Sequence, residues 1–238
     1  MGAHGCPHFR RIEITLGAMA SRPPDTAAQR AAPRLYLVTP PVEDAAGFAR
    51  ILDGVLPAAN VAAVLLRLAD ASERELINRA KTLAPVVQAR DVALLLDGHA
   101  DIAVRAGADG AHLSGVAALR DAIAALQPAR IAGAGGLRTR DDAMLAGEMG
   151  ADYVMFGEPD PAGRRPSFEA IVERVAWWAE VFQPPCVGYA GAPDEVAPLA
   201  NAGADFVALG DWIWTAAPGP AAAVQIAAGQ LAAMEPVA

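Results

Sequence analysis

The chain has 238 residues, of which 54% are hydrophobic and 5% aromatic. A chain this apolar has ample surface to bury against the entropy of ordering, which excludes disorder for most of its length. Its formal net charge is -8 and Lys81 is its only lysine, which argues against a nucleic-acid-binding protein or a polybasic membrane patch. Its apolar runs fall short of the roughly 18 residues that a membrane helix needs.

Cysteine usage favours a cytoplasmic protein. Cys6 and Cys186 are the only cysteines, too few for a disulfide framework, so we expect reduced thiols in the cytosol.

The N-terminal region has the composition of a tail. Arg10 and Arg11 precede a short apolar stretch, but Glu13 interrupts it, which makes a poor signal-peptide core. The stretch up to residue 33 is rich in Pro, Ala and polar groups. We therefore predict a flexible tail over 1–33 and one folded unit over 34–238, with Met19 as the hypothetical start of translation.

Short apolar segments alternate along the folded unit with segments of helical pattern. The strands are predicted at 34–38, 62–67, 92–97, 109–113, 130–135, 152–157, 185–190 and 205–210. The helices are predicted at about 43–54, 72–89, 99–106, 116–126, 140–148, 167–182, 193–201 and 219–233. Eight such units are typical of a closed (β/α)8 TIM barrel. A doubly wound open sheet is the main alternative, since periodicity does not prove closure.

A recurring phrase supports this periodic architecture. It reads AGADGAHL at 106–113, MGADYVMFG at 149–157 and AGADFVALG at 202–210. We expect the glycine of each phrase to end a helix in the left-handed conformation, which carries no Cβ penalty for glycine. A buried strand then follows, so the three phrases indicate three junctions of one kind.

In a barrel, the active site lies at the carboxyl ends of the strands. Arg67 ends an apolar strand and suits a phosphate or carboxylate ligand through its bidentate fork; the alternative is a surface pair with Asp70. Asp97 follows three leucines and is a candidate for catalysis, for a metal or for a ligand amine. Its alternative role is to cap the helix that starts near His99.

The loops after the last two strands often hold a phosphate in such barrels. Gly188, Gly191 and Gly210 lie there, where small residues let backbone N–H groups approach an anion. The alternative is that these glycines only make tight turns. Arg164 and Arg165 are predicted to close over an anionic ligand, unless their loop is a solvated one whose charges compensate each other.

The same strand-end rule adds further pocket candidates. His112 is either a proton donor at the mouth or a buried, hydrogen-bonded core residue. Trp212 and Trp214 follow the last strand and either could flank a ligand ring, whereas Trp177 and Trp178 are expected to pack in the outer layer. The remaining pocket candidates are Thr39, Gly135, Gly157 and Glu158.

The order of the motifs over roughly 34–225 resembles the thiamine phosphate synthase family, a (β/α)8 barrel group that includes the thiazole tautomerases. The motifs are LYLVTP at 35–40, VLLR at 64–67, LLLDGHADIAVRAGADGAHLSG at 94–115, GADYVMFGEPDP at 150–161 and AGADFVALG at 202–210. The resemblance implies a transferase of thiamine biosynthesis that couples hydroxymethylpyrimidine pyrophosphate with thiazole phosphate, using Mg2+ and releasing pyrophosphate. It implies a dissociative substitution, in which a pyrimidine cation forms before the thiazole nitrogen attacks.

This chain departs from the family pattern at the expected metal site. Gly98 stands where the family has a magnesium aspartate, which leaves the adjacent Asp97, and Val116 and Ala117 cover the position of the second one. The family's Gln-Leu-Arg with a following Lys reads Leu65-Leu66-Arg67 and Ala69 here. The resemblance therefore implies a degenerate metal site.

Further departures affect the predicted phosphate contacts. The Ser and Thr after the fifth strand read Gly135-Gly136 and Arg138-Thr139, and the Thr-x-x-Lys loop has become PAGRRP. Leu137 lies where the tautomerases carry a histidine. Two hypotheses stay open: an active synthase, or a non-catalytic or repurposed barrel that binds a phosphorylated small molecule.

Overall fold

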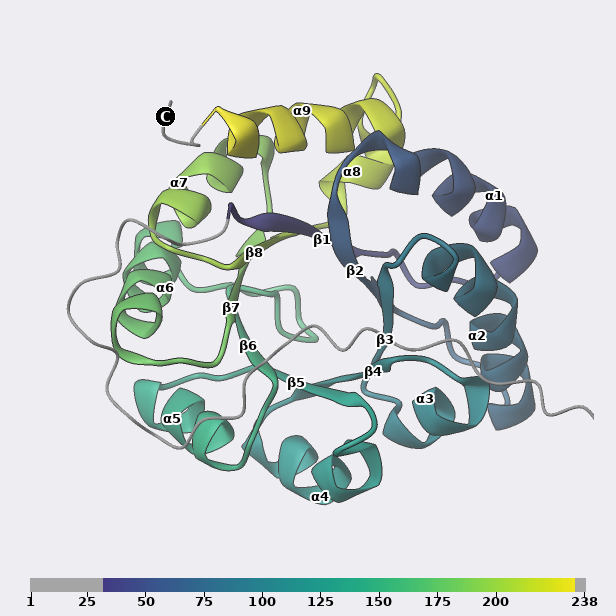
Figure 1. Ribbon diagram of the computed structural model, residues 1–238, viewed down its shortest axis with the longest axis horizontal. Coiled ribbons are helices and arrows are strands. Elements are labelled where there is room, and N and C mark those ends of the chain that lie inside the picture. The colour runs from purple at the N-terminus through teal and green to yellow at the C-terminus, as the bar shows by residue number, and fades with distance from the viewer. Residues whose placement is uncertain (1–31, 234–238) are drawn as a thin grey trace, which may run out of the picture.

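Eight parallel strands form a closed barrel in the computed structural model, which describes residues 32–233 (Figure 1). Closure is direct, because β1 pairs in parallel with both β2 and β8. The predicted TIM barrel is therefore confirmed, and the open-sheet alternative is wrong. The strands are β1 (Arg34–Val38), β2 (Val61–Leu66), β3 (Ala93–Asp97), β4 (Gly110–Ser114), β5 (Ile131–Gly135), β6 (Tyr153–Phe156), β7 (Cys186–Ala190) and β8 (Phe206–Leu209).

Helices surround this ring on its outside (Figure 1). They are α1 (Ala45–Val55), α2 (Glu73–Gln88), α3 (Ala100–Ala106), α4 (Val116–Leu126), α5 (Arg140–Glu148), α6 (Phe168–Val181), α7 (Val196–Asn201), α8 (Trp212–Thr215) and α9 (Pro220–Ala232). Two short 3-10 turns, η1 (Leu56–Ala58) and η2 (Pro193–Glu195), and the four-residue α8 were not expected from periodicity. Each is shorter than the window that a periodic pattern requires.

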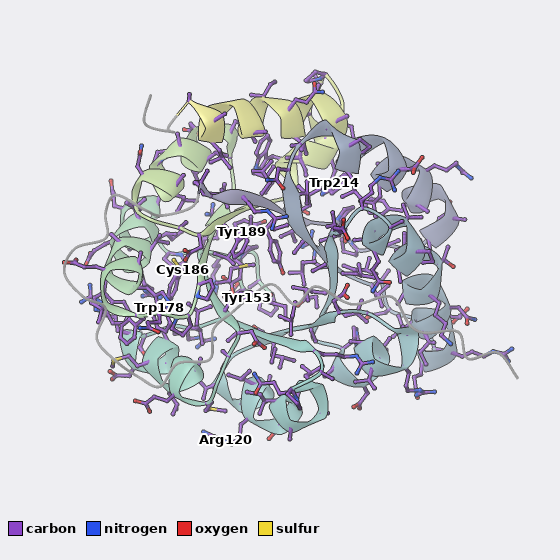
Figure 2. The ribbon with its side chains drawn as sticks, viewed as in Figure 1. Arg120, Tyr153, Trp178, Cys186, Tyr189 and Trp214 are labelled. Carbon is purple, nitrogen blue, oxygen red and sulfur yellow. The ribbon has the colours of Figure 1, made fainter. Side chains whose placement is uncertain are left out.

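The core has two layers because each strand buries both of its faces. Leu95 points into the barrel, whereas Leu94 and Leu96 on either side of it pack against the helices. This double burial explains why the strand reads as a continuous apolar run. Figure 2 shows Tyr153 and Tyr189 inside the ring and Trp178 of α6 outside it.

The three repeated phrases tie neighbouring strands together at the amino ends of the barrel. Their glycines all have positive φ, as expected. The aspartates that follow have a role that was not predicted. Asp109 Oδ2 accepts the Leu94 N–H at 2.7 Å. The equivalent bonds run from Ala132 to Asp152 at 2.8 Å and from Cys186 to Asp205 at 2.9 Å. In each phrase the glycine ends a helix, and the aspartate then acts as a strap, by which we mean a side-chain hydrogen bond to a backbone N–H of the preceding strand.

Residues 1–31, which include Cys6, Met19 and nearly all of the predicted tail, lie outside the described part of the chain. Within residues 32–233, no helix combines the length and the apolarity needed to cross a membrane. Cys186 is a buried thiol in β7.

Candidate functional site

The carboxyl ends of the strands and the loops that follow them form one end of the barrel, which we call the mouth. Parallel pairing places Asp97 of β3 directly beside His112 of β4, so the two side chains point to the same side of the sheet. Glu158 follows β6 and lies beside the same histidine, with 3.8 Å between Oε1 and His112 Nε2. Three sequence-predicted residues thus meet at the mouth.

A chain of hydroxyl groups continues from His112 into the barrel. His112 Nδ1 lies 2.9 Å from the hydroxyl of Tyr153, which in turn lies 2.9 Å from the hydroxyl of Tyr36. Burial raises the pKa of both phenols, so they stay neutral and act as hydrogen-bond partners. The charges of Asp97 and Glu158 act in the same direction on both tyrosines. His112 is therefore both a core residue and a mouth residue.

Glycines in β5 leave the space that this chain of side chains occupies. A Cβ on Gly133 would overlap the Tyr153 ring, and one on Gly135 would overlap both Glu158 and His112. The Gly136 N–H donates a hydrogen bond to Glu158 Oε1. The predicted pocket residue Gly135 therefore acts through its small size, and Glu158 is held by a backbone amide.

Arg67 pairs at the mouth with a residue that is 144 positions away in the sequence. Its backbone N–H donates to Thr39 Oγ1 at 3.0 Å, and its Nε donates to the Thr39 carbonyl oxygen. The guanidinium forms an ion pair with Asp211, which follows β8. Arg67 thus pairs with Asp211 and not with the expected alternative, Asp70. Thr39, which is fully buried, orients the arginine.

Arg165 is fully engaged by the ends of β6 and β7. Its Nε donates to the Gly157 carbonyl oxygen at 2.6 Å, and one terminal nitrogen donates to the Tyr189 carbonyl oxygen at 2.9 Å. The guanidinium also pairs with Glu195 at 3.0 Å and lies over the Tyr189 ring. Glu195 in turn accepts the Gly191 N–H at 2.6 Å. Arg165 and Gly191, both predicted to bind phosphate here, are therefore both bonded to Glu195.

The remaining predicted phosphate residues are dispersed. Gly188 faces away from the mouth, because a Cβ there would meet Leu199 of α7 at 3.0 Å. Arg164 is 79% exposed and pairs with Asp160 in its own loop. Hydrogen bonds from Arg164 lower the pKa of that aspartate. Gly210 stays at the mouth, where a Cβ would overlap the Tyr189 hydroxyl.

The tryptophans of α8 fasten this helix to the strand ends. Trp212 Nε1 donates to the Ala190 carbonyl oxygen at 3.1 Å, and Trp214 Nε1 donates to the Val38 carbonyl oxygen at 2.7 Å. Their contacts are those of structural anchors for α8. Trp178 is buried in the outer layer against Phe156 and Phe182, as expected.

The donor set for a metal is sparse. Over residues 32–233, no group of three or more His, Cys, Asp or Glu side chains is placed to hold a metal ion. Asp97 offers one carboxylate, while Glu158 is bonded to an amide and Asp211 to Arg67. Mg2+ takes six oxygen ligands, often from one or two carboxylates, substrate phosphates and water. The described side chains alone therefore do not form a preformed cage for magnesium, and an ion here would depend on Asp97 together with substrate phosphates and water.

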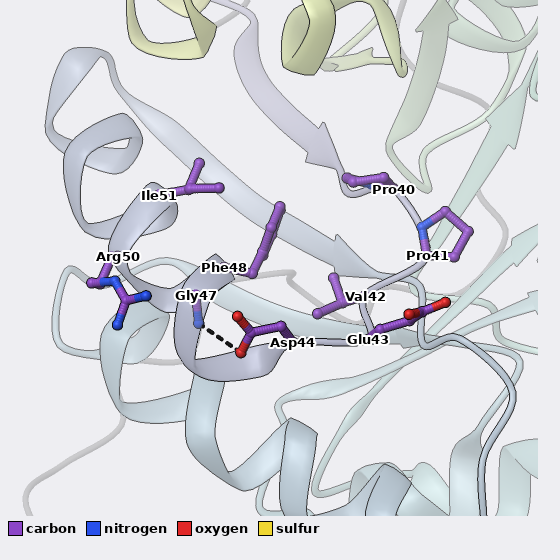
Figure 3. A pocket seen from close by; sticks show the side chains of 9 residues that line it. All are labelled: Pro40, Pro41, Val42, Glu43, Asp44, Gly47, Phe48, Arg50 and Ile51. Carbon is purple, nitrogen blue, oxygen red and sulfur yellow. Dashed lines mark hydrogen bonds between the residues drawn. The ribbon is translucent and has the colours of Figure 1, made fainter.

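A hollow of about 600 Å³ lies beside α1 and is lined by this helix and by the loop that follows β1 (Figure 3). Asp44 caps this helix by accepting the Gly47 N–H at 2.9 Å, and Phe48 lines the hollow. Arg67, Asp97, His112 and Glu158 are not among the lining residues. We therefore take the mouth, which gathers charge from several strands, as the candidate site.

Sequence reasoning missed several mouth residues. Tyr36 and Tyr153 are signalled only by a polar aromatic residue within each aliphatic strand, in LYLV and DYVMF. The pairing of Asp211 with Arg67 joins residues 144 positions apart and has no local signal in the sequence.

Comparisons with known proteins agree with the fold and with the motifs. The sequence model of the thiamine monophosphate synthase family matches residues 35–213. The chain is 43% identical to a thiamine-phosphate synthase of Rhodospirillum centenum, over 80% of this chain and 94% of the relative. It is 37% identical to one of Hyphomonas neptunium, over 84% and 95%.

Solved structures share the barrel. A thiamine phosphate pyrophosphorylase from Pyrococcus furiosus superposes with a TM-score of 0.66 and 22% identity, over 86% of this chain and 98% of that one. A 3-hexulose-6-phosphate synthase from Salmonella typhimurium gives 0.65 and 20%, over 84% and 99%. At these identities the likeness shows the fold alone.

Proposed function

This chain belongs to the thiamine monophosphate synthase family, and we propose that it catalyses the reaction for which its relatives are named. In that reaction hydroxymethylpyrimidine pyrophosphate is coupled with thiazole phosphate and pyrophosphate is released. The observation that supports the proposal is the mouth, where Asp97, His112 and Glu158 lie together and where Arg67 follows β2 at the same end of the barrel.

The charges at the mouth match those that develop in a dissociative substitution. As the leaving group departs, negative charge accumulates on the pyrophosphate and positive charge on the pyrimidine. We propose that the Arg67 guanidinium faces the departing anion, while the carboxylates of Asp97 and Glu158 face the cation. Preorganised charges of this kind stabilise a transition state without reorganising during the reaction.

The hydrogen-bonded side chains behind the mouth provide the preorganisation. The Gly136 amide holds Glu158, and Tyr153 holds the His112 ring. Burial of both groups keeps them in one arrangement, so substrates meet a fixed surface. His112 stands between Asp97 and Glu158, and we propose that its Nε2 contacts the substrate.

We propose Arg67 and the loop at Gly210 for the phosphate. Support for Gly188, Gly191, Arg164 and Arg165 is weaker, because their contacts are within the chain or point away from the mouth. Magnesium brought in with the pyrophosphate would neutralise its charge beside Asp97. Since the side chains do not form a resident site, no step is assigned to the metal.

A repurposed barrel that binds a phosphorylated small molecule without turning it over is the second candidate. The observation that favours it is the state of Arg67, whose guanidinium is already neutralised by Asp211. The absence of a group of three or more metal-ligating side chains over residues 32–233 also favours this second candidate.

An activity assay separates the two candidates. Purified protein is given both substrates with and without Mg2+, and product is measured by chromatography. Turnover that falls by about 100-fold or more in Asp97→Ala, as expected for loss of one electrostatic contact in the transition state, supports the synthase. Absence of turnover with retained binding of thiazole phosphate supports the second candidate. Complementation of a strain lacking the synthase tests the same distinction in cells.

We propose a cytoplasmic location for the protein. Support comes from its low cysteine content and from the buried thiol of Cys186, which suit a reducing compartment.

A further inference from the structure

Asp211 is an acidic residue at the position where the mouth is proposed to accept an anion. It stands at the N-cap of α8, a position where an aspartate commonly accepts backbone N–H groups of the helix. Its side chain makes no capping hydrogen bond. The carboxylate instead pairs with the guanidinium of Arg67, which follows β2 on the other side of β1.

Both partners of this ion pair are held by independent contacts. Thr39 binds the backbone N–H and the Nε of Arg67. On the other side, the Gly210 N–H donates to the Ala190 carbonyl oxygen at 3.1 Å. The Trp212 and Trp214 indoles fasten the following helix. The pair is therefore built into the fold and does not depend on a flexible surface contact.

The pair is nevertheless open to a ligand. The side chain of Arg67 is 22% exposed and that of Asp211 is 59% exposed. Arg165 is paired with Glu195 and therefore does not compete with Arg67 for Asp211. The charge of Asp211 also raises the pKa of Tyr189, in addition to the larger effect of burial on that phenol.

We infer that Asp211 is a specificity-determining residue that competes with the ligand's anion for Arg67. This inference rests on the proposed function, because it assumes that a phosphorylated ligand enters the mouth. A ligand carboxylate gains little by replacing one carboxylate with another. A phosphate carries a charge of about -1.5 to -2 at pH 7 and offers three acceptor oxygens, so it displaces Asp211. The mouth thereby selects phosphorylated ligands over carboxylated and uncharged analogues.

The test measures ligand affinity by calorimetry for the wild type, Asp211→Asn and the control Glu180→Gln. Glu180 is exposed near the C-terminal end of α6, away from the mouth, and its substitution makes the same change in net charge. The ligands are hydroxyethylthiazole phosphate, its unphosphorylated alcohol and inorganic phosphate. Releasing a partly exposed ion pair frees Arg67 at modest cost, so Asp211→Asn should bind the phosphate ester about fivefold more tightly. The alcohol should bind equally to all three proteins.

A second variant tests whether the effect acts through Arg67. In an Arg67→Met background, adding Asp211→Asn should give no more than the change produced by Glu180→Gln. Thermal melts establish that each variant is folded. Equal or weaker phosphate binding by Asp211→Asn would overturn the competition and leave the proposed ligand in place. Failure of wild type and Asp211→Asn alike to bind the ester or inorganic phosphate would remove the proposed function and this inference together.

Discussion

Replacing Asp109 by alanine tests whether the repeated aspartates are structural straps. The Asp109 carboxylate accepts the Leu94 N–H at 2.7 Å and a Gln88 side-chain N–H at 3.0 Å. Leu94 is fully buried in β3, so its amide would lose its partner away from water. Gln88 keeps a second acceptor, the Gly107 carbonyl oxygen at 2.9 Å. The backbone amide therefore dominates the effect.

An unpaired buried donor costs about 1–3 kcal/mol. We therefore expect Asp109→Ala to lower the free energy of unfolding by about 2 kcal/mol, and Tm by about 4–8 °C in a domain of this size. Asp109→Asn keeps an acceptor and should lose less than about half as much. Ligand affinity at pH 7 should be unchanged, because the strap lies at the end of the barrel opposite the mouth.

Urea unfolding followed by circular dichroism measures these differences. Glu43→Ala, at an exposed loop position, serves as the control and should stay within about 0.5 kcal/mol of the wild type. The reasoning fails if Asp109→Ala also stays within that range, or if the asparagine variant is as unstable as the alanine variant.

Two further predictions concern the mouth and a helix cap. Tyr153→Phe removes the hydroxyl between His112 and Tyr36, so the free energy of unfolding should fall by about 1–3 kcal/mol, measured in urea; no change would mean that the chain of hydrogen bonds contributes nothing. Backbone hydrogen bonds at Thr139 lower the pKa of Asp142. Its stabilising contribution is therefore present above the unfolded pKa of about 3.9 and is lost as pH falls through the lower folded value. Asp142→Asn should remove this part of the acid destabilisation, and identical pH profiles of unfolding for both proteins would contradict the assignment.

The predicted strand ends located part of the site correctly. Asp97 and His112 meet at the mouth because parallel strands place their carboxyl ends at one edge. This proximity follows from the order of the apolar segments alone, and that order can be read from the sequence. The position of Arg67 was predictable in the same way, because a charged residue directly after a buried strand lies at the mouth of the barrel.

The side chains that pair with the mouth residues could not be predicted from the sequence. Asp211, which follows β8, pairs with Arg67, which follows β2, and Arg165 contacts the end of β7 and Glu195. Closure of the barrel decides such pairings, because it brings the ends of β1, β2 and β8 together. The role of Gly135 is of the same kind, since its small size matters only beside Glu158 and His112.

By itself the sequence determined the alternation of buried strands and helices, because apolar periodicity and helix-ending glycines act over a few neighbouring residues. It also determined which side chains stand at strand ends. Only the tertiary structure decided that the sheet closes, and that Arg67 faces a carboxylate from the last strand. Ion pairs and hydrogen bonds depend on distances of a few ångströms between residues far apart in the chain, and those distances exist only once the barrel has formed.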